Sequence, residues 1–406
     1  MQLTLHPARL SGRLMPPPAK SIILRAVVCA LFCAQPLELT VGNLCEDTAA
    51  ALDCARALGF QAVLHGEKVL LTPPSQPACT AVLPCRDSAA CLHFMLAACA
   101  ARGGRYTFLL SPALQRRPHE PLLQLLRENG CQVLSGQDRL ELSGRLCPGS
   151  ITVDAALSSQ YASALMMALP SLAEPSVLTL QGTVSRPYLD LTCAVLRHFG
   201  VFLSAHDKQW RIPASVFQSP GSLCPEPDCS AAAFFAAANL LGSTVSLPDM
   251  TDCLQGDRQI VPILSKMRRQ ENCCIDVSKT PDLLPILAVV AAVLPGRRVF
   301  NGVLRLKHKE SDRIQSTRSM ICALGGQAAW DGRLLEITGG PLHGGTVNSY
   351  GDHRIAMAAA IAATVCSDSV ILQNAECVAK SYPNFWRDYL SLGGKADGKI
   401  SGVSLR

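Results

Sequence analysis

The most regular feature of the chain is a recurring succession of helix-like and strand-like patterns. In four stretches, apolar residues first recur at intervals of three and four, which is typical of an amphipathic helix. A glycine follows in each, at Gly59, Gly130, Gly200 and Gly325. Two short alternating segments joined by a polar turn come next. Each stretch therefore predicts a helix that ends in a left-handed glycine cap and leads into a β-hairpin.

Two weaker copies complete a set of six. One places Asn272 at the cap, since asparagine also tolerates the left-handed conformation, and the other places Gly393-Gly394 there. Successive cap positions lie 71, 70, 72, 53 and 69 residues apart. Six α/β units in 406 residues predict repeated packing around a common centre. Two groups of three would match the domain number expected at this length, whereas chance spacing of ordinary connections is the alternative.

Composition indicates a core-rich globular chain. Apolar residues make up 49% and charged residues 17%, which excludes a disordered protein. The net charge of +6 includes no polybasic block, so we expect no nucleic-acid partner, while a small anionic substrate fits. The apolar stretch 22–34 contains Arg25, and the run 283–294 is shorter than the roughly 20 residues of a membrane helix. We expect a cytoplasmic protein without membrane contact.

The nineteen cysteines are scattered, and no pair has CxxC spacing. Zinc sites usually have closer pairs or neighbouring histidines, and disulfide frameworks are typical of small secreted chains. We therefore expect the cysteines to be small buried hydrophobes in a reducing compartment, with no metal site among them.

Two polar islands begin apolar helices in the first half of the chain. Lys20, Ser21 and Arg25 place two cations and a hydroxyl at one helix start, which suits an anion. Residues 158–160 place two hydroxyls and an amide at another. The alternative in both places is an ordinary helix cap with solvated polar groups.

Two further islands follow in the second half. Residues 307–313 are all polar and stand before a helix, where Lys309 and Arg313 could clamp an anion while Glu310 moves a proton. Residues 351–354 precede an almost wholly apolar helix, so this cluster needs partners or a ligand. A solvated helix start is the alternative for residues 307–313.

Together the islands supply many cations and few acids, which suits a substrate with several phosphate and carboxylate groups. The cations are Lys20, Arg25, Lys309, Arg313, Arg354 and Lys380, and the accompanying acids are Asp282 and Glu310. The motifs GxxxxGK[ST], GxGxxG and GxSxG are absent, so nucleotide phosphoryl transfer and serine hydrolysis have no support.

The islands, in this order, resemble the 5-enolpyruvylshikimate-3-phosphate synthase family (3-phosphoshikimate 1-carboxyvinyltransferases). The resemblance runs from about residue 16 to residue 390. It rests on PPAKSIILRA, SSQYASALMMALP, SRPYLDLT, PDLLP, RLKHKESDRI, GDHRIAMAAAI and KSYPNF. The combination of KESDR, DHR and SSQ is specific, since the related UDP-N-acetylglucosamine enolpyruvyl transferase lacks it.

This resemblance implies an α/β fold of two inverse α/β barrel-like domains. Each would contain three copies of one α/β unit around a pseudo-threefold axis. One domain would be residues 19–226, and the other would join residues 1–18 to 227–406. The active site would lie in the cleft between them and close on the substrate.

The implied reaction transfers the enolpyruvyl group of phosphoenolpyruvate to the 5-hydroxyl of shikimate 3-phosphate through a tetrahedral intermediate that expels phosphate. It belongs to the shikimate pathway to chorismate and aromatic amino acids. No cofactor or metal is implied, and we expect a monomer.

The family's functional residues map onto this chain by motif. The resemblance implies that shikimate 3-phosphate is bound by Lys20, Ser21, Arg25, Ser158, Ser159, Gln160, Ser185, Tyr188, Asp282 and Lys309. It implies that phosphoenolpyruvate is bound by Lys20, Gln160, Arg313, Arg354 and Lys380. The acid/base candidates are Asp282, Glu310 and Lys20, and the supporting residues are His353, Ala89 and Arg117.

The chain departs from the family in one segment. Residues 87–94 read DSAACLHF where the family typically has ESGSTLRF, so Ala89 replaces a glycine and His93 an arginine. Ala113 stands where many members carry an arginine on phosphoenolpyruvate, and Arg116 or Arg117 is a candidate to compensate. Because a lost charge-assisted hydrogen bond costs about 1.5–3 kcal/mol, we expect weaker phosphoenolpyruvate binding.

We also expect insensitivity to glyphosate, the family's phosphoenolpyruvate-site inhibitor, because Ala89 adds a methyl group to that wall. The same departures leave open a non-catalytic descendant that binds shikimate 3-phosphate alone. The retained acid/base residues argue against it. An enolpyruvyl transferase with another acceptor is a third interpretation, which the retained residues 158–160 disfavour.

Overall fold

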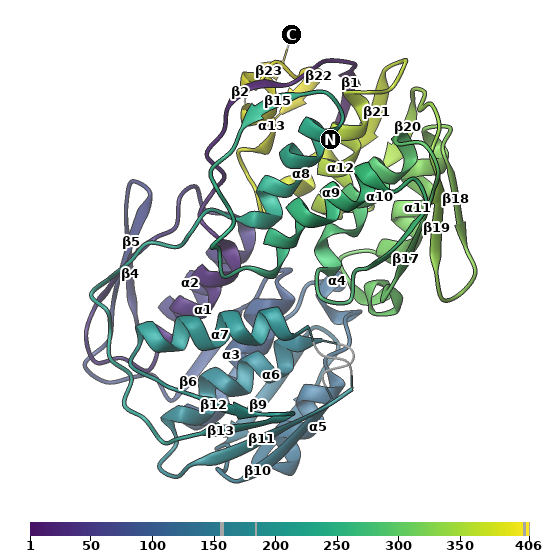
Figure 1. The fold of residues 1–406 in the computed structure, drawn as a ribbon. Coiled ribbons are helices and arrows are strands. Elements are labelled where there is room, and N and C mark those ends of the chain that lie inside the picture. Colours follow the sequence, from purple (N-terminus) through teal and green to yellow (C-terminus); the bar gives the residue numbers. More distant parts are fainter. Residues whose placement is uncertain (155–157, 183–184, 401–402, 406) are drawn as a thin grey trace. The chain divides into compact units, whose positions relative to one another are not determined.

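Two prolines in succession, Pro17 and Pro18, mark the first place where the chain passes from one structural unit to another. The structure is a computed structural model that describes residues 1–154, 158–182, 185–400 and 403–405. Pro18–Glu226 forms one compact unit, here called the inserted unit (Figure 1). Met1–Pro17 and Pro227–Arg406 together form the other, here called the split unit. Each unit has its own hydrophobic core.

The inserted unit repeats one sheet topology three times. The strand orders are β14-β3-β5-β4, β6-β7-β9-β8 and β10-β11-β13-β12. In each sheet the first two strands are parallel and the last two form an antiparallel hairpin. The strands are β3 (Leu37–Thr40), β4 (Gln61–His65), β5 (Lys68–Thr72), β6 (Thr80–Pro84), β7 (Gly104–Leu109), β8 (Cys131–Ser135), β9 (Arg139–Gly144), β10 (Ser150–Asp154), β11 (Ser176–Gln181), β12 (Ser204–His206), β13 (Gln209–Ile212) and β14 (Ser222–Leu223).

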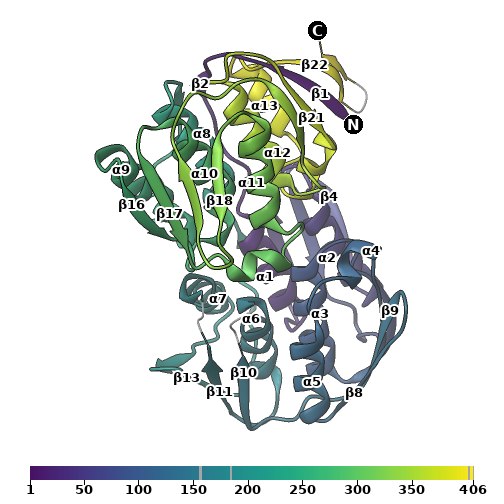
Figure 2. The same cartoon turned by 90° about the vertical axis from the view of Figure 1, so that its right-hand side faces the viewer.

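Three inner helices form the centre of this unit. They are α1 (Lys20–Ala30), α3 (Ala89–Arg102) and α6 (Ser159–Ala168), and each contacts the other two (Figure 2). Nearly every residue of these helices is buried, because apolar side chains cover all their sides. The outer helices are α2 (Glu46–Ala57), α5 (Glu120–Glu128) and α7 (Arg186–His198), with a short α4 (Pro112–Gln115) between β7 and α5.

The split unit has the same plan around inner helices α8 (Cys229–Leu240), α10 (Leu284–Val293) and α12 (His353–Ala363), which also contact one another. Its outer helices are α9 (Ile260–Arg269), α11 (Arg313–Ala323) and α13 (Phe385–Ser391). The sheets have the orders β16-β17-β19-β18, β20-β21-β1-β22-β23 and β15-β2. Their strands are β1 (Gln2–His6), β2 (Ser11–Arg13), β15 (Thr244–Ser246), β16 (Cys273–Asp276), β17 (Arg297–Asn301), β18 (Gln327–Trp330), β19 (Leu335–Thr338), β20 (Gly345–Asn348), β21 (Val370–Gln373), β22 (Lys395–Ile400) and β23 (Val403–Leu405).

The predicted helix, glycine cap and hairpin are confirmed at five of the six positions. Gly59, Gly130, Gly200, Gly325 and Gly393 all have positive φ and follow α2, α5, α7, α11 and α13. A hairpin comes after each. The threefold repetition of an α/β unit is therefore present, but the sheets formed by the described strands are open, and no closed barrel occurs among them.

The prediction of a left-handed cap at Asn272 is wrong. Helix α9 ends at Arg269, and Gln270 has extended backbone. The Asn272 side chain instead accepts a hydrogen bond from the Arg297 amide at 2.9 Å. Strand β16 follows and pairs in parallel with β17, so this copy of the pattern has no hairpin.

A search of the described helices for a membrane span finds none with sufficient length and apolar character.

Candidate active site

The predicted site residues gather at the starts of helices. Lys20 begins α1, Ala89 begins α3, and Ser159 begins α6. In the split unit, Arg313 begins α11 and His353 begins α12. An inner helix that is apolar on nearly every side holds most of its polar groups near its ends. The unpaired amides and positive dipole at a helix start also favour anions.

A buried arginine organises the polar cluster of the split unit. The Arg313 side chain is 1% exposed and donates from Nε to Asp352 at 2.9 Å, from Nη1 to Asp282 at 2.7 Å and from Nη2 to Glu310 at 2.5 Å. Burial alone would lower the pKa of Arg313, but Asp352, Glu310 and Asp282 raise it. Because a buried guanidinium is costly unless paired, these carboxylates and the arginine fix one another. Arg313 thus holds two of the predicted acid/base residues in place.

Asp282 stays ionised within this cluster. It lies in the short 3-10 helix η3 (Pro281–Leu283) that leads into α10. Arg354 Nη2 donates to its second oxygen at 2.9 Å, and Lys309 Nζ lies 3.9 Å from its first. Burial would raise the pKa of Asp282, but Arg354, Lys309 and Arg313 together lower it below the usual range. At neutral pH this carboxylate can accept a proton but has none to give.

The other predicted residues of the split unit differ in accessibility. The side chains of Glu310 and Lys309 are 17% and 24% exposed, so both are reachable from solvent. His353, Arg354 and Lys380 are buried. Lys380 ends the 3-10 helix η5 (Ala375–Lys380), which contacts α12. Charges of both signs are therefore packed around the start of α12.

Arg25 is the central buried cation of the inserted unit. It donates from Nε to Thr192 Oγ1 and from Nη1 to the Ser21 carbonyl, both at 2.8 Å, and from Nη2 to the Tyr188 carbonyl at 3.3 Å. Its guanidinium also lies over the Phe94 ring. Its hydrogen-bond partners in the described residues are neutral, and burial lowers the pKa of Arg25 to about 10. A buried cation held by neutral dipoles suits an anionic ligand.

Lys20 is held by a carboxylate that no sequence motif indicates. Its Nζ lies 2.6 Å from Oδ2 of Asp47, in the first turn of α2. Asp47 is buried, whereas the Lys20 side chain is 19% exposed. This ion pair orients the lysine while leaving part of its side chain accessible.

A hydrogen-bonded chain joins His93 to Gln160. His119 Nε2 lies 2.6 Å from the Leu114 carbonyl and must donate to it, so His119 Nδ1 accepts from His93 Nε2 at 2.9 Å. The Nδ1 of a neutral His93 is then an acceptor, but the atom 2.8 Å from it is Oε1 of Gln160, which cannot donate a hydrogen bond. The amide nitrogen of Gln160 must therefore face His93, an orientation inferred from the bonding pattern.

His93 does not replace the positive charge of an arginine. Burial, with the neighbouring His119, lowers the pKa of His93 to about 3, so the ring is neutral at physiological pH. The Arg117 charge contributes to the lowered pKa of both His93 and His119, which places this cation near the pair. Arg117 therefore contributes positive charge to this region.

The remaining predicted residues belong to the same part of the inserted unit. The Ser158 hydroxyl caps α6 by accepting a hydrogen bond from the backbone amide of Gln160 at 3.2 Å. Ser159, the next residue, is buried. Ser185 is fully buried and precedes α7, whose residue Tyr188 contacts Arg25 through its carbonyl. Through Arg25, the structure joins α1 to α6 and α7, because Arg25 also contacts Ser163.

Asp257 is a site residue that sequence reasoning missed. It is buried, accepts a hydrogen bond from the Ser230 hydroxyl, and interacts electrostatically with Asp282 and Arg354. Burial and repulsion by Asp282 raise the pKa of Asp257 to about 6, although Arg354 opposes the shift. The local sequence Gly-Asp-Arg carries no signal that would distinguish it from an exposed turn.

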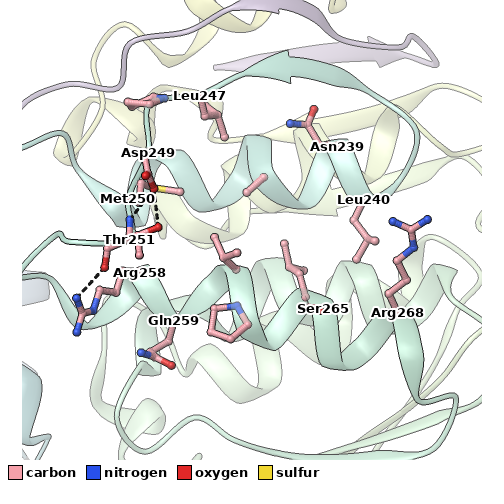
Figure 3. A pocket seen from close by; sticks show the side chains of 15 residues that line it. Asn239, Leu240, Leu247, Asp249, Met250, Thr251, Arg258, Gln259, Ser265 and Arg268 are labelled. Carbon is pink, nitrogen blue, oxygen red and sulfur yellow. Dashed lines mark hydrogen bonds between the residues drawn. The ribbon is translucent and has the colours of Figure 1, made fainter.

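A separate pocket of about 800 Å³ lies between α8 and α9 in the split unit (Figure 3). Leu240, Met250 and Leu264 contribute apolar walls, and Arg258 and Arg268 lie along its edge. None of the predicted site residues lines it. We therefore do not assign it to the candidate active site.

Comparison with known proteins identifies one family. The model of the EPSP synthase (3-phosphoshikimate 1-carboxyvinyltransferase) family matches residues 5–389. A 3-phosphoshikimate 1-carboxyvinyltransferase of Clostridium perfringens is 31% identical and aligns with 98% of this chain and 100% of its own length. A protein of the same name from Clostridium kluyveri is 32% identical, over 97% of this chain and 98% of its own.

Solved structures show the same fold at lower identity. An EPSP synthase from Acinetobacter baumannii has a TM-score of 0.80 at 20% identity, over 98% of this chain and 100% of that one. The enolpyruvyl transferase NikO from Streptomyces tendae has a TM-score of 0.78 at 20% identity, over 97% and 98%. Because the two TM-scores are so close, the fold alone does not distinguish an EPSP synthase from another enolpyruvyl transferase.

We expect Asp257→Asn to stabilise the protein at alkaline pH. The folded-state pKa of about 6 exceeds the ordinary value of 3.8, so the contribution of Asp257 to stability is greatest below pH 3.8 and is lost as pH rises through 6. At pH 8 the variant should gain about 1–3 kcal/mol, and the gain should shrink toward pH 4.5. Denaturant unfolding at both pH values measures this, with the exposed Asp252→Asn as control. A variant less stable than wild type at pH 8 contradicts the assignment.

Proposed function

The chain belongs to the EPSP synthase (3-phosphoshikimate 1-carboxyvinyltransferase) family, and we propose that it transfers the enolpyruvyl group of phosphoenolpyruvate to the 5-hydroxyl of shikimate 3-phosphate and releases phosphate. The observation that carries this proposal is that Asp282 and Glu310, the predicted acid/base carboxylates, both accept hydrogen bonds from one buried guanidinium, that of Arg313. A merely anion-binding protein has no need of two carboxylates among its cations.

The two units supply complementary groups for one substrate pair. The inserted unit contributes Arg25 and the hydroxyls of Ser21, Ser158, Ser159 and Ser185, which suit the phosphate and hydroxyls of shikimate 3-phosphate. The split unit contributes Lys309, Arg354 and Lys380 together with the carboxylates. We propose that the reaction uses groups of both units, because the hydroxyls suited to shikimate 3-phosphate lie in one unit and the two acid/base carboxylates lie in the other.

The charge balance around Asp282 suggests how its basicity is controlled. Arg354 and Lys309 lower its pKa while they lie against it. Phosphate and carboxylate groups of the substrates compete for the same cations, which raises the pKa of Asp282 and makes it a better acceptor for the proton of the 5-hydroxyl. Binding of anions thereby activates the base.

The proton that adds to the methylene carbon of phosphoenolpyruvate comes from another group. The ionised state of Asp282 in the cluster without substrates disfavours it as the source. We assign the donation to Glu310 or Lys20, which are partly exposed on well-anchored side chains. Attack by the 5-hydroxyl oxygen then gives a tetrahedral intermediate, from which phosphate departs as the surrounding cations stabilise its charge.

The altered wall of the phosphoenolpyruvate site lowers affinity without removing the chemistry. His93 is neutral, and its two ring nitrogens are hydrogen-bonded to Gln160 and His119. One charge-assisted contact to phosphoenolpyruvate is therefore missing relative to an arginine at this position. Such a loss raises the KM for phosphoenolpyruvate by about ten- to a hundredfold. Arg117 supplies a nearby positive charge that offsets part of it.

We further propose that the protein acts as a cytoplasmic monomer that needs no metal or organic cofactor for this reaction and binds no nucleic acid. Its nineteen cysteines are free, which fits a reducing compartment. The residues assigned to the two substrates supply the charges and proton-transfer groups that the reaction requires.

Purified protein should release phosphate only when shikimate 3-phosphate and phosphoenolpyruvate are both present. Glu310→Gln should lower kcat at least a hundredfold, because it removes a proton-transfer group while keeping its shape. The exposed Glu271→Gln serves as control and should leave kcat unchanged. Binding of shikimate 3-phosphate in calorimetry without phosphate release from wild type would instead support the non-catalytic alternative.

Wild-type activity should resist glyphosate, and Ala89→Gly should restore sensitivity by at least tenfold in the inhibitor concentration for half activity. The reason is the methyl group that Ala89 adds at the start of α3, where the family has glycine. Ala90→Gly is the matched control, since it makes the same change one residue along the helix. Equal inhibition of wild type and Ala89→Gly would show that this methyl group does not control the response.

A further inference from the structure

Three cysteines that are distant in sequence meet in the core of the inserted unit. Cys54 lies on α2, Cys85 follows β6, and Cys91 lies on α3. All three are buried. The Sγ atom of Cys54 lies 3.9 Å from that of Cys85 and 3.8 Å from that of Cys91, and all three sulfur atoms lie within 4.8 Å of one another.

The backbone around Cys85 and Cys91 is firmly held by Ser88. The Ser88 amide donates to the Cys85 carbonyl at 3.0 Å, and the Ser88 hydroxyl accepts from the Cys91 amide at 3.3 Å as the cap of α3. Cys54 is fixed independently within α2, which contacts both α3 and β6. The three thiols are therefore held by regular elements and a helix cap, which favours a preorganised site.

The triangle of sulfur atoms has the dimensions of a metal–thiolate site. For these two separations, with the third side between about 3.8 and 4.8 Å, a point equidistant from the three sulfurs lies about 2.2–2.5 Å from each. A zinc–thiolate bond is about 2.3 Å long. We propose that Cys54, Cys85 and Cys91 bind one soft closed-shell metal ion, Cu⁺ or Zn²⁺, as thiolates.

Soft thiolate ligands select these two ions over magnesium, calcium or manganese. Among the His, Cys, Asp and Glu side chains that the structure describes, the group contains three donors and no fourth. Three sulfur donors suffice for Cu⁺, whereas Zn²⁺ usually takes four ligands and would need a water or exogenous thiol to complete its coordination. The donor set thus favours Cu⁺, with Zn²⁺ as the other ion of the same chemistry.

Binding of a metal ion as thiolates displaces the protons of the three thiols, which must reach solvent. Arg86, adjacent to Cys85, lies at the surface and pairs with Asp53, adjacent to Cys54, so the cluster is close to solvent.

Packing of three cysteines as small hydrophobes gives similar separations, so metal affinity must distinguish the two interpretations. The full chain, reduced and kept free of oxygen, is titrated with Cu⁺ against a competing Cu⁺ chelator and, separately, with Zn²⁺ against a chromophoric chelator. We expect one equivalent of one ion to bind at least a hundredfold more tightly than any further equivalents. X-ray absorption should show three sulfur neighbours at about 2.2–2.4 Å.

Cys54→Ser and Cys91→Thr should each weaken that equivalent at least a hundredfold. Two controls should not change it: Cys193→Ser, a buried thiol on α7, and Cys147→Ser, an exposed one. Circular dichroism of each variant checks that it folds. Cys91→Thr provides a second variant if Cys54→Ser fails to fold. Tight binding of either ion that depends on Cys54 and Cys91 supports the site. Binding of neither ion above the level of the exposed thiols, or binding that survives both substitutions, overturns it.

Discussion

Helices that are apolar on nearly every side hold most of their polar groups near their first turns, and this constraint organises both units. Each unit packs three such helices together, α1, α3 and α6 in one and α8, α10 and α12 in the other. Lys20, Gln160 and His353 lie in the first turns of helices, where unpaired amides and the dipole favour anions. The same packing that builds each core thus limits where substrate can bind. A reaction between two anionic substrates suits such a framework.

Within the split unit, the buried guanidinium of Arg313 connects the framework to the chemistry. It is sustained by Asp352, at the cap of α12, and by the two carboxylates Asp282 and Glu310. Loss of the arginine would leave three carboxylates facing one another in a buried region, which is strongly unfavourable. The cations against Asp282 keep it ionised. The stability and the ionisation of this cluster therefore depend on one balance of charge.

Local patterns predict the repeated elements well, whereas long-range contacts and burial lie beyond them. Five glycine caps were predictable because a left-handed helix end favours glycine, but Asn272 was not, since its side chain is used by the distant Arg297 amide. The residues that resemble family motifs locate the charged islands, yet the neutral state of His93 follows from burial beside His119. Asp257 meets Asp282 and Arg354, which are 25 and 97 residues away, and the cysteine cluster joins Cys54 to Cys91, 37 residues along the chain. No spacing rule for a motif detects such contacts.

We propose that these residues transfer the enolpyruvyl group to the 5-hydroxyl of shikimate 3-phosphate. A carbon NMR spectrum of the product formed from shikimate 3-phosphate and phosphoenolpyruvate labelled with ¹³C at C2 tests this transfer. We expect a vinyl ether whose labelled carbon shows coupling through oxygen to the proton at position 5 of the shikimate ring, formed in step with phosphate release. Labelled pyruvate in place of the ether, an ether at another hydroxyl, or unchanged phosphoenolpyruvate would contradict it.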